Sequence, residues 1–169
     1  CWRMDPDVPL VVPEVNAQEI HNAKKGIIAN PNCSTIQAVV ALKPLYDTYG
    51  IKRIVYATYQ AVSGGGAAGY NDLKNGIAGK APEKFPYPIF ANALPHIDVF
   101  TESGYTKEEL KMISETRKIL SDATLPITAT CVRIPVYTSH SEAINIELGS
   151  AFELSDVRNL LAGAPGIVV

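Results

Sequence analysis

The chain has 169 residues, of which 47% are hydrophobic and 19% charged, and its formal net charge is −2 at pH 7. This length and composition are typical of one globular domain and exclude disorder as the dominant state. The small negative charge argues against a nucleic-acid protein that uses a basic face. No apolar run approaches the roughly 20 residues of a membrane helix, and Cys1–Pro9 lacks the apolar core of a secretory signal. We therefore expect no nucleic-acid or membrane partner.

Three cysteines occur, at Cys1, Cys33 and Cys131. An odd and sparse set is a poor disulfide framework and favours a reducing compartment, so we expect a cytoplasmic protein. The chain contains neither CxxC nor HExxH spacing. We therefore expect no metal site.

The first part of the chain predicts short strands and two helices. A short helix is expected over Asn16–Lys24. A longer one should run from Ser34 to Gly50, because apolar residues recur there at helical spacing, and Pro44 should kink or split it. Strands are predicted at Leu10–Pro13, Gly26–Ala29 and Ile51–Gln60. The segment from Gly26 to Gln60 could then form a right-handed strand–helix–strand crossover.

The second part begins with a glycine-rich stretch at 61–69, which matches neither phosphate-loop fingerprint. The prolines of 85–95 predict an ordered loop. Thr106 and Glu109 fit a capping box for a helix that ends near Leu120. Three further elements are predicted: a strand over Ile127–Ile134 with Ala129, Cys131 and Arg133 on one face, a strand over Ala143–Leu148, and a helix over Ser155–Leu161 with Ser155 as cap and Gly163 as stop.

This order of elements predicts a single α/β or α+β domain. The chain opens at Cys1 without an initiator Met and closes on Gly166–Val169, an apolar run typical of the start of a strand. We therefore expect it to be a piece of a longer protein.

The turn before the long helix carries the most informative residue. Cys33 follows Asn30-Pro31-Asn32 at a predicted strand-to-helix turn. The free N–H groups and the positive end of a helix dipole favour a thiolate there, and the same N–H groups could hold an oxyanion. Most free cysteines, however, are small buried hydrophobic residues. Residue types alone leave both interpretations open.

A thiolate nucleophile needs a proton partner, and His140 lies in a loop between two predicted strands, where catalytic groups often occur. Arg133, in an otherwise apolar strand, needs an anionic partner, either an internal carboxylate or a substrate carboxylate. Glu108 and Lys111 are three residues apart on a helix, so a surface ion pair of little energetic value is the simplest interpretation. We expect His21 and His96 to be structural or surface residues.

The chain resembles the aspartate-semialdehyde dehydrogenase family in several blocks that follow one another in order. The nucleophile motif of that family resembles Asn30-Pro31-Asn32-Cys33-Ser34-Thr35-Ile36-Gln37. The other similar blocks are Trp2–Met4, Val11–Asn16, Ala57–Gly64, Asn92–Asp98 and Cys131–Val136 followed by His140-Ser141-Glu142. Matches along the whole chain are more specific than one motif, so the resemblance favours Cys33 as nucleophile.

The resemblance implies an NADP-dependent enzyme that reduces β-aspartyl phosphate to aspartate semialdehyde and phosphate. This step leads to lysine, diaminopimelate, methionine and threonine. By the same resemblance, Cys33 would form an acyl-thioester, His140 would be the general acid/base, and Gln60 would orient the reacting group. Arg133 would bind the substrate carboxylate and Glu108 its ammonium group, with Gln60 beside them. The phosphate ligands would be Arg3, Asn32 and Lys111, and the cofactor contacts Ser63 and Gly64.

The resemblance also implies the architecture of residues 1–169. They would form most of the catalytic and dimerisation domain, similar to that of glyceraldehyde-3-phosphate dehydrogenase-like enzymes, with helices on a mixed, largely antiparallel sheet. The N-terminal Rossmann domain and a C-terminal segment would be missing, so this piece alone should be inactive. The stretch from Ala67 to Phe85 is short compared with many relatives. We expect a homodimer or tetramer acting on a small-molecule substrate.

Two alternatives come from other functional classes. One is another Cys/His acyl-transfer enzyme, such as a thioesterase or amidase, which would need no nucleotide. The other is a family member without catalysis that serves as a dimerisation scaffold. The combination of Cys33, Gln60, Arg133 and His140 favours the dehydrogenase over both.

Overall fold

The computed structural model describes residues 2–169, which form two compact units. The first unit contains residues 2–55, Lys111–Thr128 and Ile144–Val169. The second contains Tyr56–Leu110 and Ala129–Ala143. Each of the three strands, and helix α4, contributes residues to both units.

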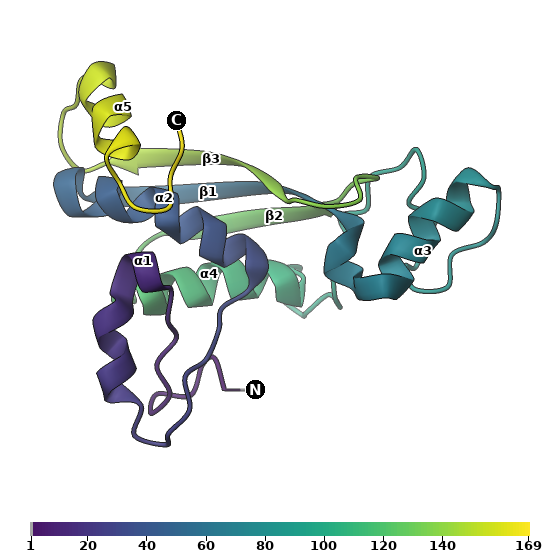
Figure 1. Ribbon diagram of the computed structural model, residues 1–169, viewed down its shortest axis with the longest axis horizontal. Helices are drawn as coiled ribbons and strands as arrows, with labels where there is room; N and C mark the ends of the chain where they lie inside the picture. The colour runs from purple at the N-terminus through teal and green to yellow at the C-terminus, as the bar shows by residue number, and fades with distance from the viewer. Residues whose placement is uncertain (1) are drawn as a thin grey trace. The chain divides into compact units, whose positions relative to one another are not determined.

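The sheet is mixed, as expected, and its strand order is β2-β1-β3 (Figure 1). Strand β1 covers Ile51–Gln60, β2 Ile127–Arg133 and β3 Ser141–Leu148. Strand β1 has the predicted bounds. The Ile54 N–H donates to the Pro126 carbonyl and the Ile134 N–H to the Gln60 carbonyl, so β1 and β2 are parallel. Gly149 donates to Gly50 and Arg53 to Asn145, so β3 runs antiparallel to β1. One pair of neighbouring strands is parallel and the other antiparallel, so the antiparallel share is smaller than expected.

The predicted crossover from Gly26 to Gln60 is wrong. Gly26–Ala29 is not a strand of this sheet, and Ala29 forms only an isolated parallel bridge with Leu10. The strand predicted at Leu10–Pro13 is reduced to the same bridge, because Pro13 begins a helix. Proline has no N–H for a ladder but fits the first turn of a helix.

The first unit contains α1, η1, α2 and α5. In place of the helix predicted over Asn16–Lys24, a 3-10 helix, η1, covers Ala17–Asn22, and it directly follows a short α-helix, α1 (Pro13–Asn16). Helix α2 (Cys33–Tyr49) ends at Gly50 as predicted and continues through Pro44 without a break. In Figure 1, α5 (Leu154–Ala162) lies beside α2, which it contacts.

Two expectations near the C-terminal end of the chain are wrong. The N-cap of α5 is Glu153, so Ser155 lies inside the helix, although Gly163 ends it as expected. Residues 167–169 have no regular secondary structure, so the predicted start of a strand at Gly166–Val169 does not form.

The second unit contains a helix that the sequence did not predict, α3 (Gly66–Ile77), preceded by the 3-10 turn η2 (Val62–Gly65). The glycines disfavour a helix, but buried Leu73 packs in a cluster with Val62, Ile89 and Leu94. Asp72 is also buried, and its carboxylate accepts N–H groups from Glu83, Lys84 and Phe85 at 2.8–2.9 Å. Tertiary contacts therefore outweigh the low helix propensity of the glycines. Residues 85–95, which follow α3, form an ordered loop as predicted.

Helix α4 (Lys107–Ile119) begins with the predicted capping box. The Thr106 N–H donates to Glu109 Oε2 at 2.7 Å, and the Glu109 N–H donates to Thr106 Oγ1 at 3.3 Å. Glu109 Oε1 also accepts the Cys131 N–H of β2 at 3.1 Å. Ala129, Cys131 and Arg133 are buried, as predicted for one face of this strand. Glu109 thus caps α4 and also accepts an N–H of the edge strand β2 that would otherwise lack a neighbouring strand to bond to.

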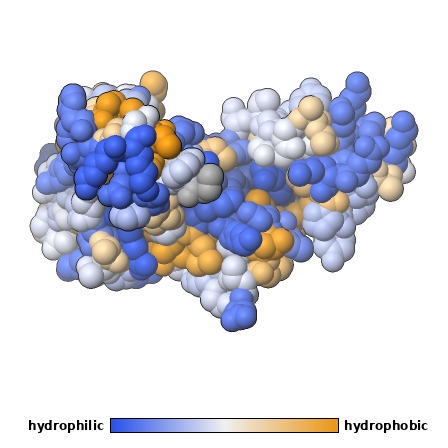
Figure 2. Space-filling view, turned by 90° about the horizontal axis from the view of Figure 1, so that it is seen from below, coloured by the Kyte–Doolittle hydropathy of each residue, from blue (hydrophilic) through white to orange (hydrophobic). Residues whose placement is uncertain are grey.

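The face drawn in Figure 2 is mainly hydrophilic, with separate hydrophobic areas. Exposed apolar side chains include Trp2 and Phe100, at 46% and 56% exposure. Within residues 2–169, no helix has the length and apolar character needed to cross a membrane.

Candidate functional site

Cys33 is the first residue of α2 and is exposed. Its predecessor Asn32 is the N-cap, with an extended backbone, and Asn32 Oδ1 accepts the N–H groups of Ser34 at 3.0 Å and Thr35 at 3.4 Å. The sequence folds this way because asparagine satisfies N–H groups that an opening helix leaves unpaired. Exposure excludes the interpretation of Cys33 as a buried hydrophobic residue.

Cys131 has the opposite environment. It is 0% exposed on β2. Burial raises the pKa of its thiol to about 12, and the nearby carboxylates of Glu108, Glu109 and Glu142 act in the same direction, although a hydrogen bond with Thr58 opposes them. This thiol therefore stays protonated near neutral pH and is a poor nucleophile.

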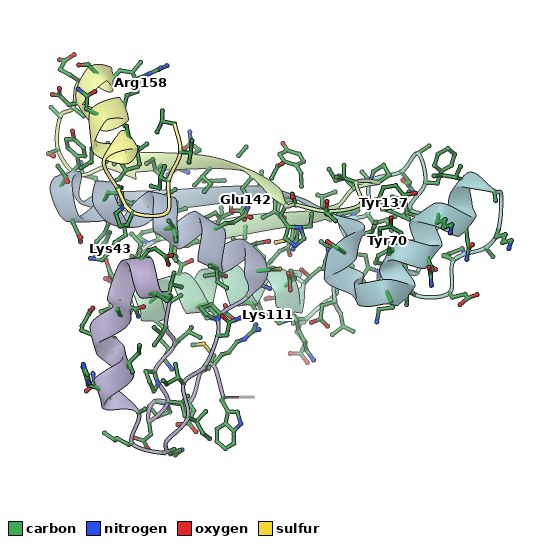
Figure 3. The ribbon with its side chains drawn as sticks, viewed as in Figure 1. Lys43, Tyr70, Lys111, Tyr137, Glu142 and Arg158 are labelled. Atoms are coloured by element: carbon green, nitrogen blue, oxygen red, sulfur yellow. The ribbon has the colours of Figure 1, made fainter. Side chains whose placement is uncertain are left out.

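Two cations predicted to bind phosphate line one pocket of the first unit. The pocket measures about 430 Å³ and is lined by Arg3, Met4, Lys111, Ser114 and Glu115. Figure 3 labels Lys111 on α4. Arg3 donates to Glu115 Oε1 at 3.1 Å, and the backbone N–H of Asn32 donates to Glu115 Oε2 at 2.6 Å. One buried carboxylate therefore joins Arg3 to the turn that carries Cys33.

Gln60 and Glu108, both predicted to bind substrate, are joined in the second unit. Gln60 is 0% exposed at the end of β1, and its Nε2 donates to Glu108 Oε1 at 3.0 Å. Thr58 Oγ1 donates to Gln60 Oε1 at 3.3 Å. Glu108 is itself buried, which does not fit its expected position on the surface. These bonds satisfy polar groups that are buried and fix the orientation of both side chains.

His140 and Arg133 both bond to the backbone of Ala61. The Ala61 N–H donates to His140 Nδ1 at 2.9 Å, and Arg133 Nη1 donates to the Ala61 carbonyl at 2.8 Å. Because Nδ1 accepts this bond, the neutral ring has its proton on Nε2. Burial lowers the pKa of His140, and the Arg133 charge lowers it further, whereas Glu108 raises it.

Gly64 allows this close packing. A Cβ at Gly64 would lie 2.6 Å from Arg133 Nη1 and 3.4 Å from His140 Cε1, so a larger residue would displace the guanidinium. Arg133 is buried, and its Cζ lies 5.9 Å from the ring centroid of Phe85. That ring contact adds cation–π stabilisation to the buried charge.

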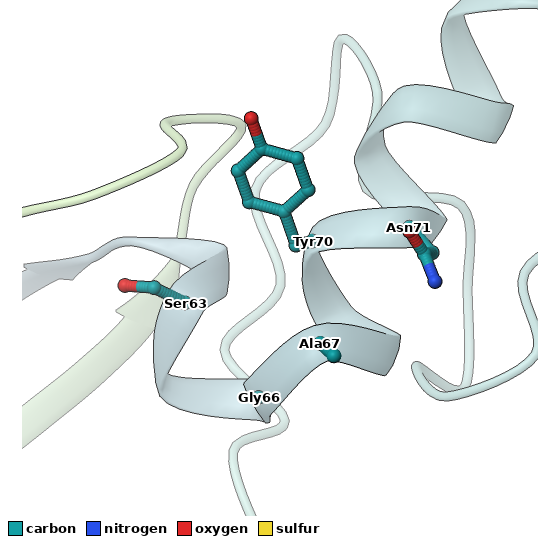
Figure 4. Close-up of a pocket in the computed structure, with 5 residues that line it drawn as sticks. All are labelled: Ser63, Gly66, Ala67, Tyr70 and Asn71. Atoms are coloured by element: carbon teal, nitrogen blue, oxygen red, sulfur yellow. The ribbon is translucent and has the colours of Figure 1, made fainter.

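The predicted cofactor residues Ser63 and Gly64 both lie in η2. Ser63 borders a pocket of about 420 Å³ whose other walls are Gly66, Ala67, Tyr70 and Asn71, as Figure 4 shows. Gly64 is not part of this wall. The Tyr70 ring contacts that of Tyr137 (Figure 3), with centroids 4.6 Å apart and the ring planes tilted by 37°.

The structure thus places the predicted site residues in two groups, one in each unit. Those of the first unit are Cys33, Arg3, Asn32 and Lys111, and those of the second are Gln60, Glu108, Arg133, His140, Ser63 and Gly64. Sequence reasoning missed Glu115 and the backbone of Ala61. The only signal for Glu115 is its position one helical turn after Lys111. Residues 2–169 contain no group of three or more His, Cys, Asp or Glu side chains that could hold a metal ion.

Comparison with known proteins places these residues in a family. A family model described as the dimerisation domain of semialdehyde dehydrogenase matches residues 42–169. The aspartate-semialdehyde dehydrogenase of Aquifex aeolicus is 58% identical over 177 residues, covering 100% of this chain and 52% of the relative. That of Legionella pneumophila is 50% identical over 177 residues, covering 100% and 51%. The chain spans about half the length of the curated relatives it matches.

Solved structures agree with this assignment. The structure of aspartate semialdehyde dehydrogenase II from Vibrio cholerae, complexed with ASA, superposes with a TM-score of 0.93 and 45% identity, covering 98% of this chain and 51% of that one. The enzyme of Candida albicans with NADP has a TM-score of 0.71 and 29% identity, covering 96% and 46%. On the family match and these relatives together, the chain belongs to the semialdehyde dehydrogenase family and carries its dimerisation domain.

Proposed function

We propose that the full-length protein is an NADP-dependent, phosphorylating aspartate-semialdehyde dehydrogenase. In the biosynthetic direction it would convert β-aspartyl phosphate and NADPH to aspartate semialdehyde, phosphate and NADP⁺. The observation that carries the proposal is an exposed cysteine at a helix N-terminus whose N-cap is tied to an arginine by a buried carboxylate. The names of the relatives support the same reaction.

Cys33 would act as the nucleophile. Its sulfur would form a bond to the acyl carbon while the bond from that carbon to the phosphate oxygen breaks, so that inorganic phosphate leaves and an acyl-thioester remains. Arg3, Asn32 and Lys111 would bind the phosphoryl group before it leaves. Cations and a helix N-terminus are suited to that charge.

Residues of the second unit are assigned to the other groups of the substrate. Arg133 would bind the α-carboxylate, because a guanidinium forms two parallel bonds to a carboxylate, and Glu108 would bind the ammonium group. Gln60, already fixed by Glu108 and Thr58, would orient the acyl group. The substrate carries both charges, so each of these side chains would match a group of opposite charge.

His140 would be the general acid/base. In the arrangement described above, its Nε2–H can donate a hydrogen bond to an oxyanion. To take up a proton from a thiol, the neutral ring has to use Nδ1 and give up the bond from Ala61, or else exchange its tautomer. The lowered pKa keeps the ring neutral near pH 7, ready for either step.

NADP would be held beside η2. Ser63 borders a pocket whose walls include the small residues Gly66 and Ala67, which leave room for part of a nucleotide, whereas Gly64 packs against Arg133 and His140. When bound, NADPH supplies the hydride that reduces the thioester. Ser63 and Gly64 would position it, and collapse of the reduced adduct would release the aldehyde and regenerate the Cys33 thiolate.

The biological setting follows from the reaction. We propose a cytoplasmic enzyme of the aspartate pathway, which leads to lysine, diaminopimelate, methionine and threonine. The dimerisation domain supports a homo-oligomer, and we propose a dimer or tetramer.

The test is an assay of the full-length protein in the reverse direction. Aspartate semialdehyde, NADP⁺ and phosphate are mixed, and NADPH absorbance is followed for the wild type and Cys33→Ala. We expect NADPH formation that requires phosphate and disappears in the variant. No signal from a folded wild type would remove the dehydrogenase proposal and leave acyl transfer or a scaffold role.

A further inference from the structure

Glu115 occupies a central position between two groups that the proposed function assigns to phosphate. It lies on α4, one helical turn after Lys111, and only 1% of its side chain is exposed. Its two carboxylate oxygens serve different partners: Oε1 accepts from Arg3 Nη1 at 3.1 Å, and Oε2 accepts the Asn32 N–H at 2.6 Å. A buried carboxylate is costly unless such donors compensate it, so this geometry is strongly specified.

The bond to Asn32 completes the cap of α2 from another helix. In an ordinary capping box, a glutamate three residues into the helix accepts the N–H of the N-cap residue. The third residue of α2 is Thr35, which cannot reach back in this way, and its hydroxyl instead donates to Met112 of α4 at 3.6 Å. Glu115 supplies the missing acceptor and so fixes the peptide group between Pro31 and Asn32, one residue before Cys33.

The bond to Arg3 fixes a cation that comes from an irregular segment. Arg3 lies in a turn, and 37% of its side chain is exposed, so an unsupported guanidinium would sample several rotamers. Glu115 takes one of its N–H groups and leaves others that can donate to a ligand. Arg3, Lys111 and Glu115 line the same 430 Å³ pocket.

We propose that Glu115 is a positioning residue for the phosphate subsite, acting through Arg3 and the Asn32 N–H to set the anion site beside Cys33. This inference rests on the proposed function, which identifies the anion as phosphate. Glu115 is not itself a phosphate ligand, because two anionic groups repel each other. Its contribution is to preorganise the cation and the helix terminus that bind the anion.

The first measurement needs no turnover. Iodoacetamide labelling of Cys33 is followed by peptide-resolved mass spectrometry in the full-length protein, with increasing inorganic phosphate. We expect phosphate to protect Cys33, and the half-protecting concentration to rise at least about tenfold in Glu115→Gln. Glutamine offers one acceptor oxygen, and its NH₂ group would face either the guanidinium or the Asn32 N–H. Glu115→Asp, which keeps the charge, should restore part of the protection.

A double-mutant cycle separates positioning from general destabilisation. In an Arg3→Met background, Glu115→Gln should add much less than tenfold, because one of the groups it positions is gone. Asp122→Asn is the control: it removes a carboxylate that follows the C-terminal end of α4, accepts a hydrogen bond from Tyr46 and does not line the pocket. That variant should keep the wild-type half-protecting concentration.

Steady-state kinetics in the reverse direction give the second readout. We expect Glu115→Gln to raise KM for phosphate at least about tenfold while KM for aspartate semialdehyde changes less than about twofold. The inference is overturned if folded Glu115→Gln keeps wild-type protection, if Asp122→Asn loses as much, or if both KM values and kcat change together. Glu115-dependent protection in a wild type that forms no NADPH would instead overturn the proposed function alone.

Discussion

At the scale of single residues, the two described cysteines differ in the property that decides their reactivity. Cys33 is exposed at a helix N-terminus, whereas Cys131 is buried, with a thiol pKa of about 12. Only the thiolate reacts with an alkylating reagent. The same local difference separates the proposed nucleophile from a core residue.

We therefore predict that iodoacetamide at pH 7.5 labels Cys33 at least about tenfold faster than Cys131. The measurement is mass spectrometry of tryptic peptides in a Cys1→Ser background, which removes the remaining cysteine. Labelling in denaturant is the control, since both thiols should then react at similar rates. Equal slow labelling of the folded protein would contradict a nucleophilic Cys33.

Arg133→Lys should weaken the proposed substrate clamp. Lysine keeps the charge but cannot form two parallel bonds to a carboxylate, and it cannot match the bond from Arg133 to the Ala61 carbonyl. Loss of a charged hydrogen bond costs about 1.5–3 kcal/mol, so kcat/KM for aspartate semialdehyde should fall roughly ten- to hundredfold. Arg53→Lys, an exposed position on β1, is the matched control. Unchanged kinetics of Arg133→Lys in the full-length enzyme would refute the assignment.

At the scale of elements, α3 depends on one buried carboxylate. Burial raises the pKa of Asp72, but the N–H groups of Glu83, Phe85 and Lys84 lower it more, and the net pKa lies below the usual 3.8. Asp72→Ala would leave these N–H groups without their acceptor, and we expect a loss of about 1–3 kcal/mol in the free energy of unfolding. Denaturant unfolding checks this value, with the exposed Asp156→Ala as control.

The same group predicts a pH dependence. Because the folded pKa of Asp72 is lowered, its contribution to stability is full above the unfolded value near 3.8 and is lost as pH falls through the lower folded value. Wild type should therefore lose more stability than Asp72→Asn over this acidic range. Parallel pH profiles of the two proteins would show that the carboxylate is not stabilised in this way.

The sequence predicted those elements whose local signals agree with the fold. Strand β1 and the capping box at Thr106 have strong local patterns, and the structure confirms both. Helix α3 was not predicted because its glycines have low helix propensity. The helix is stabilised by the tertiary contacts of Asp72 and Leu73, which the local pattern does not show. Pro44 was expected to kink or split the long helix, but α2 continues as one helix although proline has no N–H to donate.

The candidate site also has parts that local sequence patterns predict and parts that they do not. The position of Cys33 at the turn before the long helix was predicted from the local pattern, and the structure confirms it; that Asn32 is the N-cap emerges only from the structure. The functional roles came from a resemblance and stay predictions. Glu115 could not be found, because its partners Arg3 and Asn32 are distant in sequence and only folding brings the three together.

At the scale of the whole molecule, the chain corresponds to about half of its curated relatives. We predict that residues 1–169 alone bind NADP poorly and form little or no NADPH in the reverse assay, because the rest of the relatives' length would supply the nucleotide-binding fold. The full-length protein assayed beside it is the control. Comparable turnover by the two would contradict the prediction.

The backbone bonds of Ala61 affect what mutational maps can reveal. Any small residue at position 61 would present the same N–H to His140 and the same carbonyl to Arg133, so glycine and serine should be tolerated in a selection for activity. Proline suits the local φ of −66°, yet its ring carbon would occupy the place of the donated hydrogen and displace the imidazole. In a library of substitutions at residue 61, small residues should therefore keep activity and large ones should lose it. Proline should lose activity although it is small. That loss would identify the main-chain bond to the histidine.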